Sequence, residues 1–214
     1  MVVGRSHRGT LHLVPSEDYW WLHALTTPRL TTSNATRLRQ EGVDEHHAER
    51  GVATIAEALS GGDVRTRGEL RILLDAAGIP TAGQALVHLL FAASNAGHAV
   101  RGPVVQGAGS TVTEQAFVDP ALWIGPRPDI DIATAERFLV GHGPADAKDL
   151  VKWTGMALSA ARRAFAALDP AGPDREPTAS PSPRLLGPFD PILHGWASRD
   201  MFVGPHHGVV REMA

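Results

Sequence analysis

Apolar and polar residues alternate near the start of the chain in a pattern that predicts a strand followed by a helix. Arg8–Val14 alternates in the way typical of a strand. Ser16 can cap the helix that follows, with two acidic residues behind it at the positive end of the helix dipole. We expect this helix to stop near Thr27-Pro28, because proline disfavours helix at the residue before it.

The middle of the chain has the pattern of a winged helix-turn-helix unit. We expect helices over Val43–Leu59, over Arg67–Ala77 with Thr66 as its N-cap, and over Gln84–Asn95. Two strand-like stretches, 98–105 and 111–118, then flank a glycine-rich loop. In a winged helix the second helix of the pair enters a major groove while the hairpin touches the DNA backbone.

A second helical pairing is expected in the last part of the chain. Apolar spacing predicts helices over 132–141, 146–154 and 158–168, but no hairpin follows them. Asp169–Pro183 is rich in Pro, Ser and acidic residues, which is typical of a linker. Three prolines in the segment around Leu185–Trp196 exclude a long helix there.

Composition points to a globular intracellular protein. The 214 residues include 43% hydrophobic and 20% charged residues and no Cys, which excludes disulfides, thiolate ligands and a Cys nucleophile. The longest apolar run, around Ala85–Ala93, is interrupted by His88 and falls short of the ~18 residues of a membrane span. We therefore expect a cytoplasmic, nucleoid-associated protein with no membrane partner and no signal peptide.

The net charge argues against DNA binding but does not exclude it. Lys and Arg total 20 against 23 acidic residues, a formal charge of −3, whereas a free-standing DNA-binding domain is usually basic. Most of the basic residues are Arg, which can bind phosphate and guanine in a two-pronged geometry. Acidic winged helices often serve as protein–protein interaction modules, so that alternative stays open.

Three blocks of residues, in order, resemble the winged-helix family that contains the AlkZ and YcaQ interstrand-crosslink DNA glycosylases. They are Arg8-Gly9-Thr10-Leu11-His12; His142-Gly143-Pro144-Ala145 with Asp149-Leu150 and Trp153-Thr154-Gly155-Met156; and Leu185-Leu186 with Phe189-Asp190-Pro191 and Arg199. The resemblance implies tandem winged helices followed by a small β-barrel, and an activity that removes alkylated or crosslinked purines from double-stranded DNA.

The resemblance also implies a fold class and a domain organisation. We expect an α+β fold, mainly α, with tandem winged helix-turn-helix units and a short remnant of a C-terminal β-barrel. The expected parts are a remnant of a first winged-helix unit (1–30), a winged-helix unit (31–125), a helix-turn-helix unit (126–170), a linker (171–184) and a partial β-barrel segment (185–214).

The family's catalytic element, two glutamines separated by one residue, has no counterpart in this sequence. The element lies upstream of the Arg8–His12 segment in the family, and none of the four glutamines here has a Gln-x-Gln spacing. The chain thus resembles the middle of a family member, and we expect binding without intact catalysis. An active glycosylase that uses His12 or Asp190 is the alternative; Glu17 and Asp18 are better explained as dipole partners of a helix.

Candidate DNA contacts come from both the pattern and the resemblance. Gln84 and His88 are four residues apart on a helix, on a face opposite Leu86 and Leu90. Arg101 and Gln106 border the expected wing, and Arg162 and Arg163 occupy the corresponding helix of the later unit. The full set is Arg5, Arg8, Thr10, His12, Arg67, Gln84, His88, Arg101, Gln106, Arg162 and Arg163.

No metal or cofactor site is expected. Asp44-Glu45-His46-His47-Ala48-Glu49 gathers potential ligands, but adjacent helical residues diverge by about 100°, and a two-His site needs i, i+4 spacing. His206-His207 lies close to the terminus. We also expect self-association, because a strand at Arg8–Val14 without its hairpin partner would expose an unpaired edge.

Overall fold

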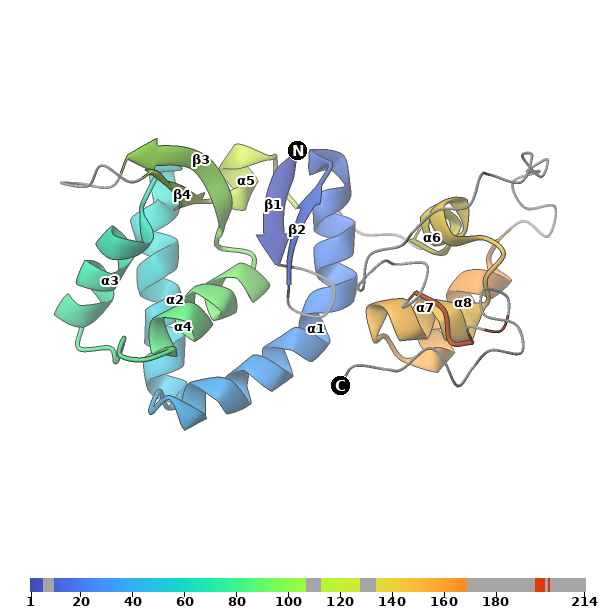
Figure 1. Ribbon diagram of the computed structural model, residues 1–214, viewed down its shortest axis with the longest axis horizontal. Coiled ribbons are helices and arrows are strands. Elements are labelled where there is room, and N and C mark those ends of the chain that lie inside the picture. Colours follow the sequence, from blue (N-terminus) through green and yellow to red (C-terminus); the bar gives the residue numbers. More distant parts are fainter. Residues whose placement is uncertain (6–9, 107–112, 128–133, 169–194, 199, 201–214) are drawn as a thin grey trace. The chain divides into compact units, whose positions relative to one another are not determined.

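The computed structural model describes residues 1–5, 10–106, 113–127, 134–168, 195–198 and 200 (Figure 1). The chain divides into two compact units, Met1–Ile130 and Asp131–Ala214, which we describe separately. The described part is mainly helical with one small antiparallel sheet, so the predicted class, α+β and mainly α, is confirmed.

The sheet of the first unit contains four strands in the order β2-β1-β3-β4. They are β1 (Val2–Arg5), β2 (Leu11–Val14), β3 (Val100–Gln106) and β4 (Thr113–Val118). Residues 6–9 and the expected wing tip at 107–112 lie outside the described residues. The prediction that the strand ending at Val14 lacks a partner is wrong, because β2 pairs with β1 from Val2↔Val14 to Arg5↔Leu11. Too few residues precede this strand for a periodicity to identify β1.

The first helix runs much further than predicted. Helix α1 spans Ser16–Gln40 and passes through Pro28, where Figure 1 shows it bending. Both halves bury side chains, Tyr19 and Trp20 on one side of the proline and Leu38 on the other. The prediction that Thr27-Pro28 ends the helix is therefore wrong, since packing of both halves outweighs the hydrogen bond that proline removes.

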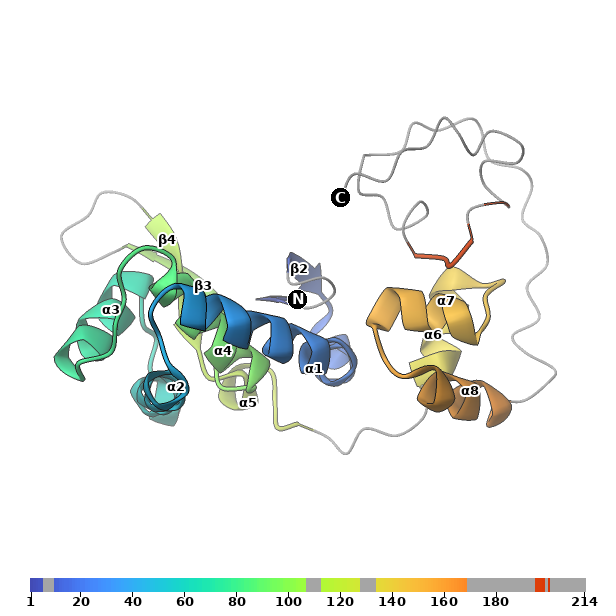
Figure 2. The ribbon, with the colours of Figure 1, turned by 90° about the horizontal axis from the view of Figure 1, so that it is seen from below.

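Three further helices pack into the main apolar cluster of this unit. They are α2 (Glu45–Leu59), α3 (Arg67–Ala76) and α4 (Ala85–Asn95), with a short turn, η2 (Ser60–Gly62), after α2. Their existence was predicted, while the short helix α5 (Pro120–Trp123) was not. Figures 1 and 2 show α4 beside both α1 and α2. The buried members of the cluster are Leu38, Val43, Ile55, Leu59, Leu70, Leu74, Ile79, Ala85, Leu86, Leu89, Leu90, Ala93, Ala99 and Phe117.

The predicted N-cap of α3 is confirmed as a complete capping box. The Thr66 hydroxyl accepts a hydrogen bond from the Glu69 amide at 3.2 Å, and the Glu69 carboxylate accepts one from the Thr66 amide at 2.7 Å. These bonds also hold the pKa of Glu69 below its ordinary value.

Replacing Thr66 by alanine should lower the free energy of unfolding of the first unit by about 1 kcal/mol, the usual loss for a helix cap. Hydrogen exchange of the α3 amides would measure the change. Thr66→Ser keeps the accepting oxygen and serves as the control. Equal exchange in the alanine variant and the wild type would show that the box contributes nothing.

One buried histidine makes the stability of the first unit depend on pH. His23 on α1 is 2% exposed, and one of its ring nitrogens lies 2.9 Å from the Ser94 carbonyl. Its other nitrogen, Nδ1, is buried with no hydrogen-bond partner among the described residues. Burial lowers the pKa of His23 from 6.5; the hydrogen bond to Ser94 opposes this shift, and Arg127 adds to it.

Acidification should therefore destabilise the first unit. Because the unfolded chain takes up the His23 proton more readily, the stability is fully present above pH 6.5 and declines as the pH falls toward the folded-state pKa. We expect His23→Phe to reduce the slope of the melting temperature against pH between pH 7 and 5. Subtracting the slope of the variant from that of the wild type removes the contribution of the other histidines. Identical slopes would contradict the assignment of the pH dependence to His23.

The described part of the second unit contains the three predicted helices. Helices α6 (Thr134–His142), α7 (Ala147–Thr154) and α8 (Leu158–Ala166) pack Phe138, Leu150, Ala161 and Ala164 into a small core. Asp146 caps α7, and Gly155 ends it with φ of 77°, a conformation that favours glycine. The predicted linker lies outside the described residues, as does nearly all of the predicted barrel segment.

Candidate nucleic-acid interface

Two arginines from different elements line one small groove of the first unit. Arg67 comes from the start of α3 and Arg101 from β3. The groove holds about 70 Å³, and we name it the Arg67–Arg101 groove. It is lined by Val3, Gly4, Leu11, Arg67, Val87, Leu90, Ser94, Val100, Arg101 and Phe117, contributed by β1, β2, β3, β4, α3 and α4.

Arg101 is held in a fixed position. Its guanidinium lies 4.2 Å from the centroid of the Phe117 ring, within the range of a cation–π interaction. It also donates a hydrogen bond to the Gln115 carbonyl at 3.0 Å. Both contacts cross from β3 to β4, and the pairing Arg101↔Phe117 sets their register. A pre-positioned guanidinium loses little side-chain entropy when it binds an anion.

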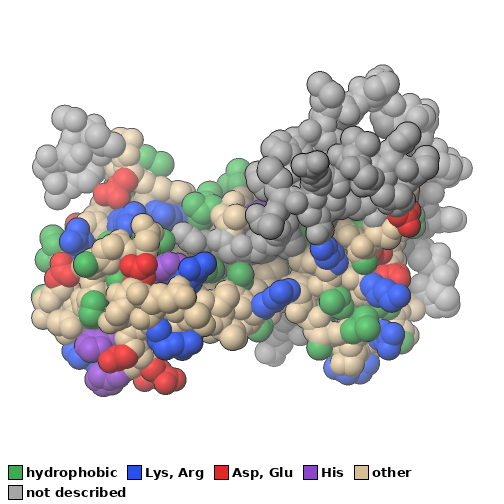
Figure 3. All heavy atoms as spheres, turned by 60° about the horizontal axis from the view of Figure 1, so that its bottom comes forward, with side chains coloured by type: hydrophobic (Ala, Val, Ile, Leu, Met, Phe, Trp, Pro, Cys, Tyr) green, Lys and Arg blue, Asp and Glu red, His purple; other side chains and the backbone are tan. Residues whose placement is uncertain are grey.

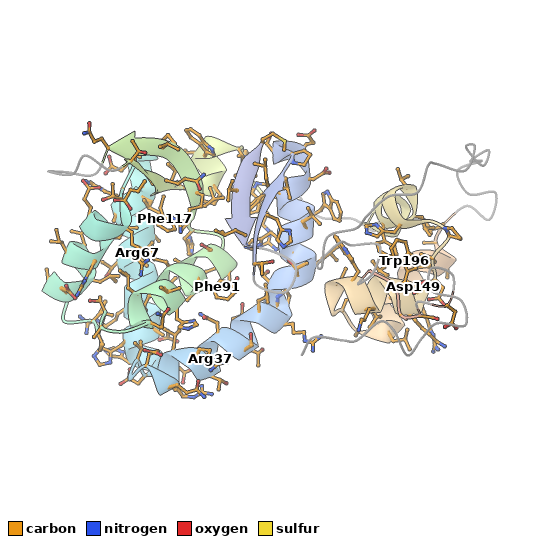
Figure 4. All side chains as sticks on the ribbon, viewed as in Figure 1. Arg37, Arg67, Phe91, Phe117, Asp149 and Trp196 are labelled. Carbon is orange, nitrogen blue, oxygen red and sulfur yellow. The ribbon has the colours of Figure 1, made fainter. Side chains whose placement is uncertain are left out.

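Arg67 is exposed and lies between two concavities. Figure 4 shows it on α3, near Phe117. It also lines a second pocket of about 310 Å³, together with Gly68, Arg71, Thr81, Ala82, Gly83, Leu86 and Glu114. Arg71 lies 3.6 Å from Asp75 in an exposed ion pair, so part of its charge is compensated locally. Arg67 therefore offers the more available charge of the two α3 arginines.

The predicted contacts on the first strands are only partly described. His12 lies on the edge strand β2 and Thr10 just before it, with 2.8 Å between the Thr10 hydroxyl and His12 Nε2. Neighbouring Leu11 lines the Arg67–Arg101 groove. Arg5 ends β1 opposite Leu11, while its side chain, like all of Arg8, lies outside the described atoms.

The expectation of an open recognition face on the helix after Thr81 is wrong. Seven of the side chains of α4 are buried, and none belongs to the exposed class. The His88 ring contacts the Asn34 amide oxygen at 2.7 Å, and its backbone carbonyl accepts from the same amide at 2.9 Å. Gln84 is exposed at the helix start and donates its backbone N–H to Glu41. A face that looked polar is covered by α1, whose extension past Pro28 the sequence pattern did not predict.

The remaining predicted contacts lie elsewhere. Gln106 is exposed at the end of β3, next to the wing tip that is outside the described residues. Arg162 and Arg163 are exposed on α8 of the second unit. On the face drawn in Figure 3, basic and acidic side chains are interspersed, in keeping with the net charge of −3.

Sequence reasoning missed two residues of this site. Arg71 follows Arg67 by four positions on a predicted helix, so the spacing alone could have placed both on one face. Phe117 supports Arg101 across the hairpin, which only the strand register determines. No signal in the sequence fixes that register.

The catalytic alternatives gain no supporting geometry. Asp190 lies outside the described residues. Asp18 accepts a hydrogen bond from the Trp21 indole at 2.7 Å at the start of α1, consistent with a structural role. The His47 ring lies 2.8 Å from the carboxylate of Asp44, the N-cap residue of α2. Nowhere in the described ranges do three His, Asp or Glu side chains come together in a way that could hold a metal ion. Likewise, none of the described helices is both long and apolar enough to traverse a bilayer.

Comparison with known proteins gives two similarities. A family model described as DNA glycosylase AlkZ-like matches residues 1–210. Among solved structures, the chain is similar to Streptomyces sahachiroi DNA glycosylase AlkZ, with 21% sequence identity and a TM-score of 0.56. That match covers 77% of this chain and 47% of the other, so the chain spans about half the length of that protein. No curated protein matches.

Proposed function

Because the chain belongs to the AlkZ-like DNA glycosylase family, we propose that it binds double-stranded DNA through the Arg67–Arg101 groove. The observation that carries the proposal is the convergence of two arginines from separate elements, one exposed and one fixed over Phe117. Phosphate contacts of this kind position a protein on a duplex without reading its sequence. Thr10 precedes β2, His12 lies on β2 and Gln106 ends β3, and these three side chains would add polar contacts.

We further propose that residues 31–125 contain a winged-helix unit, formed by α2, α3, α4 and the β3–β4 hairpin. Support comes from the order α2, α3, α4, then the β3–β4 hairpin, together with an isolated antiparallel bridge between Arg65 and Phe117 just before α3. Since α1 covers α4 on the side of His88, the unit would approach DNA with the start of α3, the sheet and the part of α4 that lines the Arg67–Arg101 groove. The helices α6, α7 and α8 would form the second helix-turn-helix unit, with Arg162 and Arg163 as contacts.

Base excision is not part of this proposal. The 214-residue sequence contains no Gln-x-Gln, the spacing that the resemblance implies for the family's catalytic element. An abasic-site assay on duplex DNA carrying N7-alkylated purines would test this point. Cleavage above background would instead support the alternative, in which His12 or Asp190 takes part.

Fluorescence anisotropy with a labelled duplex tests DNA binding directly. We expect affinity to fall as salt rises, with a slope of log affinity against log salt near −0.9 for each phosphate contact. A folded sample that gives no binding at low salt would refute the proposal. A stable protein complex that excludes DNA would favour the interaction-module alternative.

Self-association is a second candidate property, favoured by one observation. Leu11 and Leu13 on the outer strand β2 are 49% and 62% exposed. Exposed apolar side chains on an edge strand promote pairing between copies. Light scattering over a range of concentrations would test this, with Leu13→Lys expected to keep the protein monomeric.

A further inference from the structure

A second groove, lined by α1, α2 and α4, shares no residue with the Arg67–Arg101 groove. Its volume is about 440 Å³, within the range of small-molecule sites. Small and apolar side chains supply most of the walls. The lining residues are Thr31, Asn34, Ala35, Leu38, Ala48, Glu49, Val52, Ala53, Ala92, Asn95, Ala96 and His98.

Asn95 lines this groove and carries an unused amide buried beneath its surface. The residue ends α4 and is 7% exposed, and both its amide nitrogen and its amide oxygen are buried without a partner among the described residues. Asn34 lines the same groove, but its amide is fully engaged with His88 through bonds of 2.7 and 2.9 Å. The two asparagines therefore differ in role. A buried amide with neither donor nor acceptor satisfied lowers stability, and buried amides are usually bonded to protein, water or a ligand.

The charge of the lining restricts what can bind. Glu49 is the one acidic side chain in the lining, and no Lys or Arg contributes to it. A phosphate would meet repulsion from Glu49, and the lining supplies no Lys or Arg to neutralise its charge. The groove therefore favours an uncharged ligand that has an apolar ring face and presents a donor and an acceptor side by side.

We propose that this groove binds a free purine base such as adenine. An Asn amide can pair with the adjacent donor and acceptor of adenine through two hydrogen bonds. The flat ring would pack against the small side chains of the three helices, Ala35, Ala48 and Ala92 among them. Because the Asn95 amide atoms are covered in the ligand-free groove, binding turns this side chain toward the ligand about its soft terminal torsion.

The test follows the Asn95 side-chain amide by NMR while adenine is added to the full chain. The signals of this amide are identified by their absence in Asn95→Leu. We expect a saturable shift in the wild type, and at least tenfold weaker binding by calorimetry for Asn95→Leu, since two hydrogen bonds are lost. Benzimidazole, which lacks the amino group, should also bind at least tenfold more weakly to the wild type.

Two controls separate binding from folding and from DNA. Ala53→Trp fills the groove from α2 without altering Asn95, and should abolish adenine binding even if Asn95→Leu fails to fold. Adenosine monophosphate and a short duplex should shift the Asn95 signals less than adenine does. No shift with adenine, or equal affinity in Ala53→Trp, would overturn the proposal and leave a buried water as the partner of Asn95. Neither outcome of the adenine experiment affects the proposal of DNA binding, which fluorescence anisotropy tests separately.

Discussion

Leu89→Ala should lower the free energy of unfolding of the first unit by about 3 kcal/mol, the cost of a cavity in a core that cannot close around it. Leu89 has no exposed surface and belongs to the main apolar cluster. A Cβ added at Gly51 of α2 would lie 2.8 Å from Leu89 Cδ2, which shows how closely α2 and α4 approach at this point. The adjoining backbone leaves little scope for relaxation.

Hydrogen exchange resolved by peptide would measure this loss. At about 1.4 kcal/mol for each tenfold change, amides of α2 and α4 should exchange about a hundredfold faster in the variant. Peptides from α7 and α8 belong to the other compact unit and should be unaffected. Ile72→Ala is the matched control, because Ile72 is 68% exposed on α3 and its truncation should change stability little. Equal effects of the two variants would contradict the description of the core.

Arg67→Glu should weaken DNA binding by about tenfold or more. The substitution replaces an attractive charge at the Arg67–Arg101 groove by a repulsive one, and it would remove the phosphate contact proposed for Arg67. The slope of log affinity against log salt should decrease in magnitude by about 1. Because Arg67 is exposed, the variant should fold as the wild type does.

Arg37→Glu provides the control for charge alone. Arg37 is exposed near the end of α1, where it donates to Gln40 at 3.0 Å, and Figure 4 shows it well apart from Arg67. The two variants have the same net charge, so a general electrostatic effect would weaken binding equally in both. We expect the Arg37 variant to stay within about twofold of wild-type affinity. Similar losses in the two variants would remove the groove from the proposed interface.

Local signals in the sequence predicted the elements that depend on local chemistry. Thr66 and Glu69 specify the start of α3 by a hydrogen-bonding pattern confined to four residues. The apolar spacing of α4 and the strand pattern of the β3–β4 hairpin are equally local, and both elements lie close to where they were expected.

Features that depend on packing could not be predicted in this way. Pro28 predicts a helix end, but burial of Trp20 and Leu38 on either side keeps the helix intact. For the same reason the polar positions of α4 did not reveal that α1 covers them. The Arg67–Arg101 groove combines six elements, so its arginines were each selected from the sequence while their proximity was not.

The length of α1 has a consequence for how the first unit comes apart. Tyr19 and Trp20 belong to one apolar cluster with Val2, Val100 and Val118, whereas Leu38 belongs to the other, around α2 and α4. The one helix α1 thus anchors both apolar clusters. Unfolding of either end of α1 should therefore destabilise the cluster at its other end. A proteolytic cut beside Pro28 should destabilise both clusters at once.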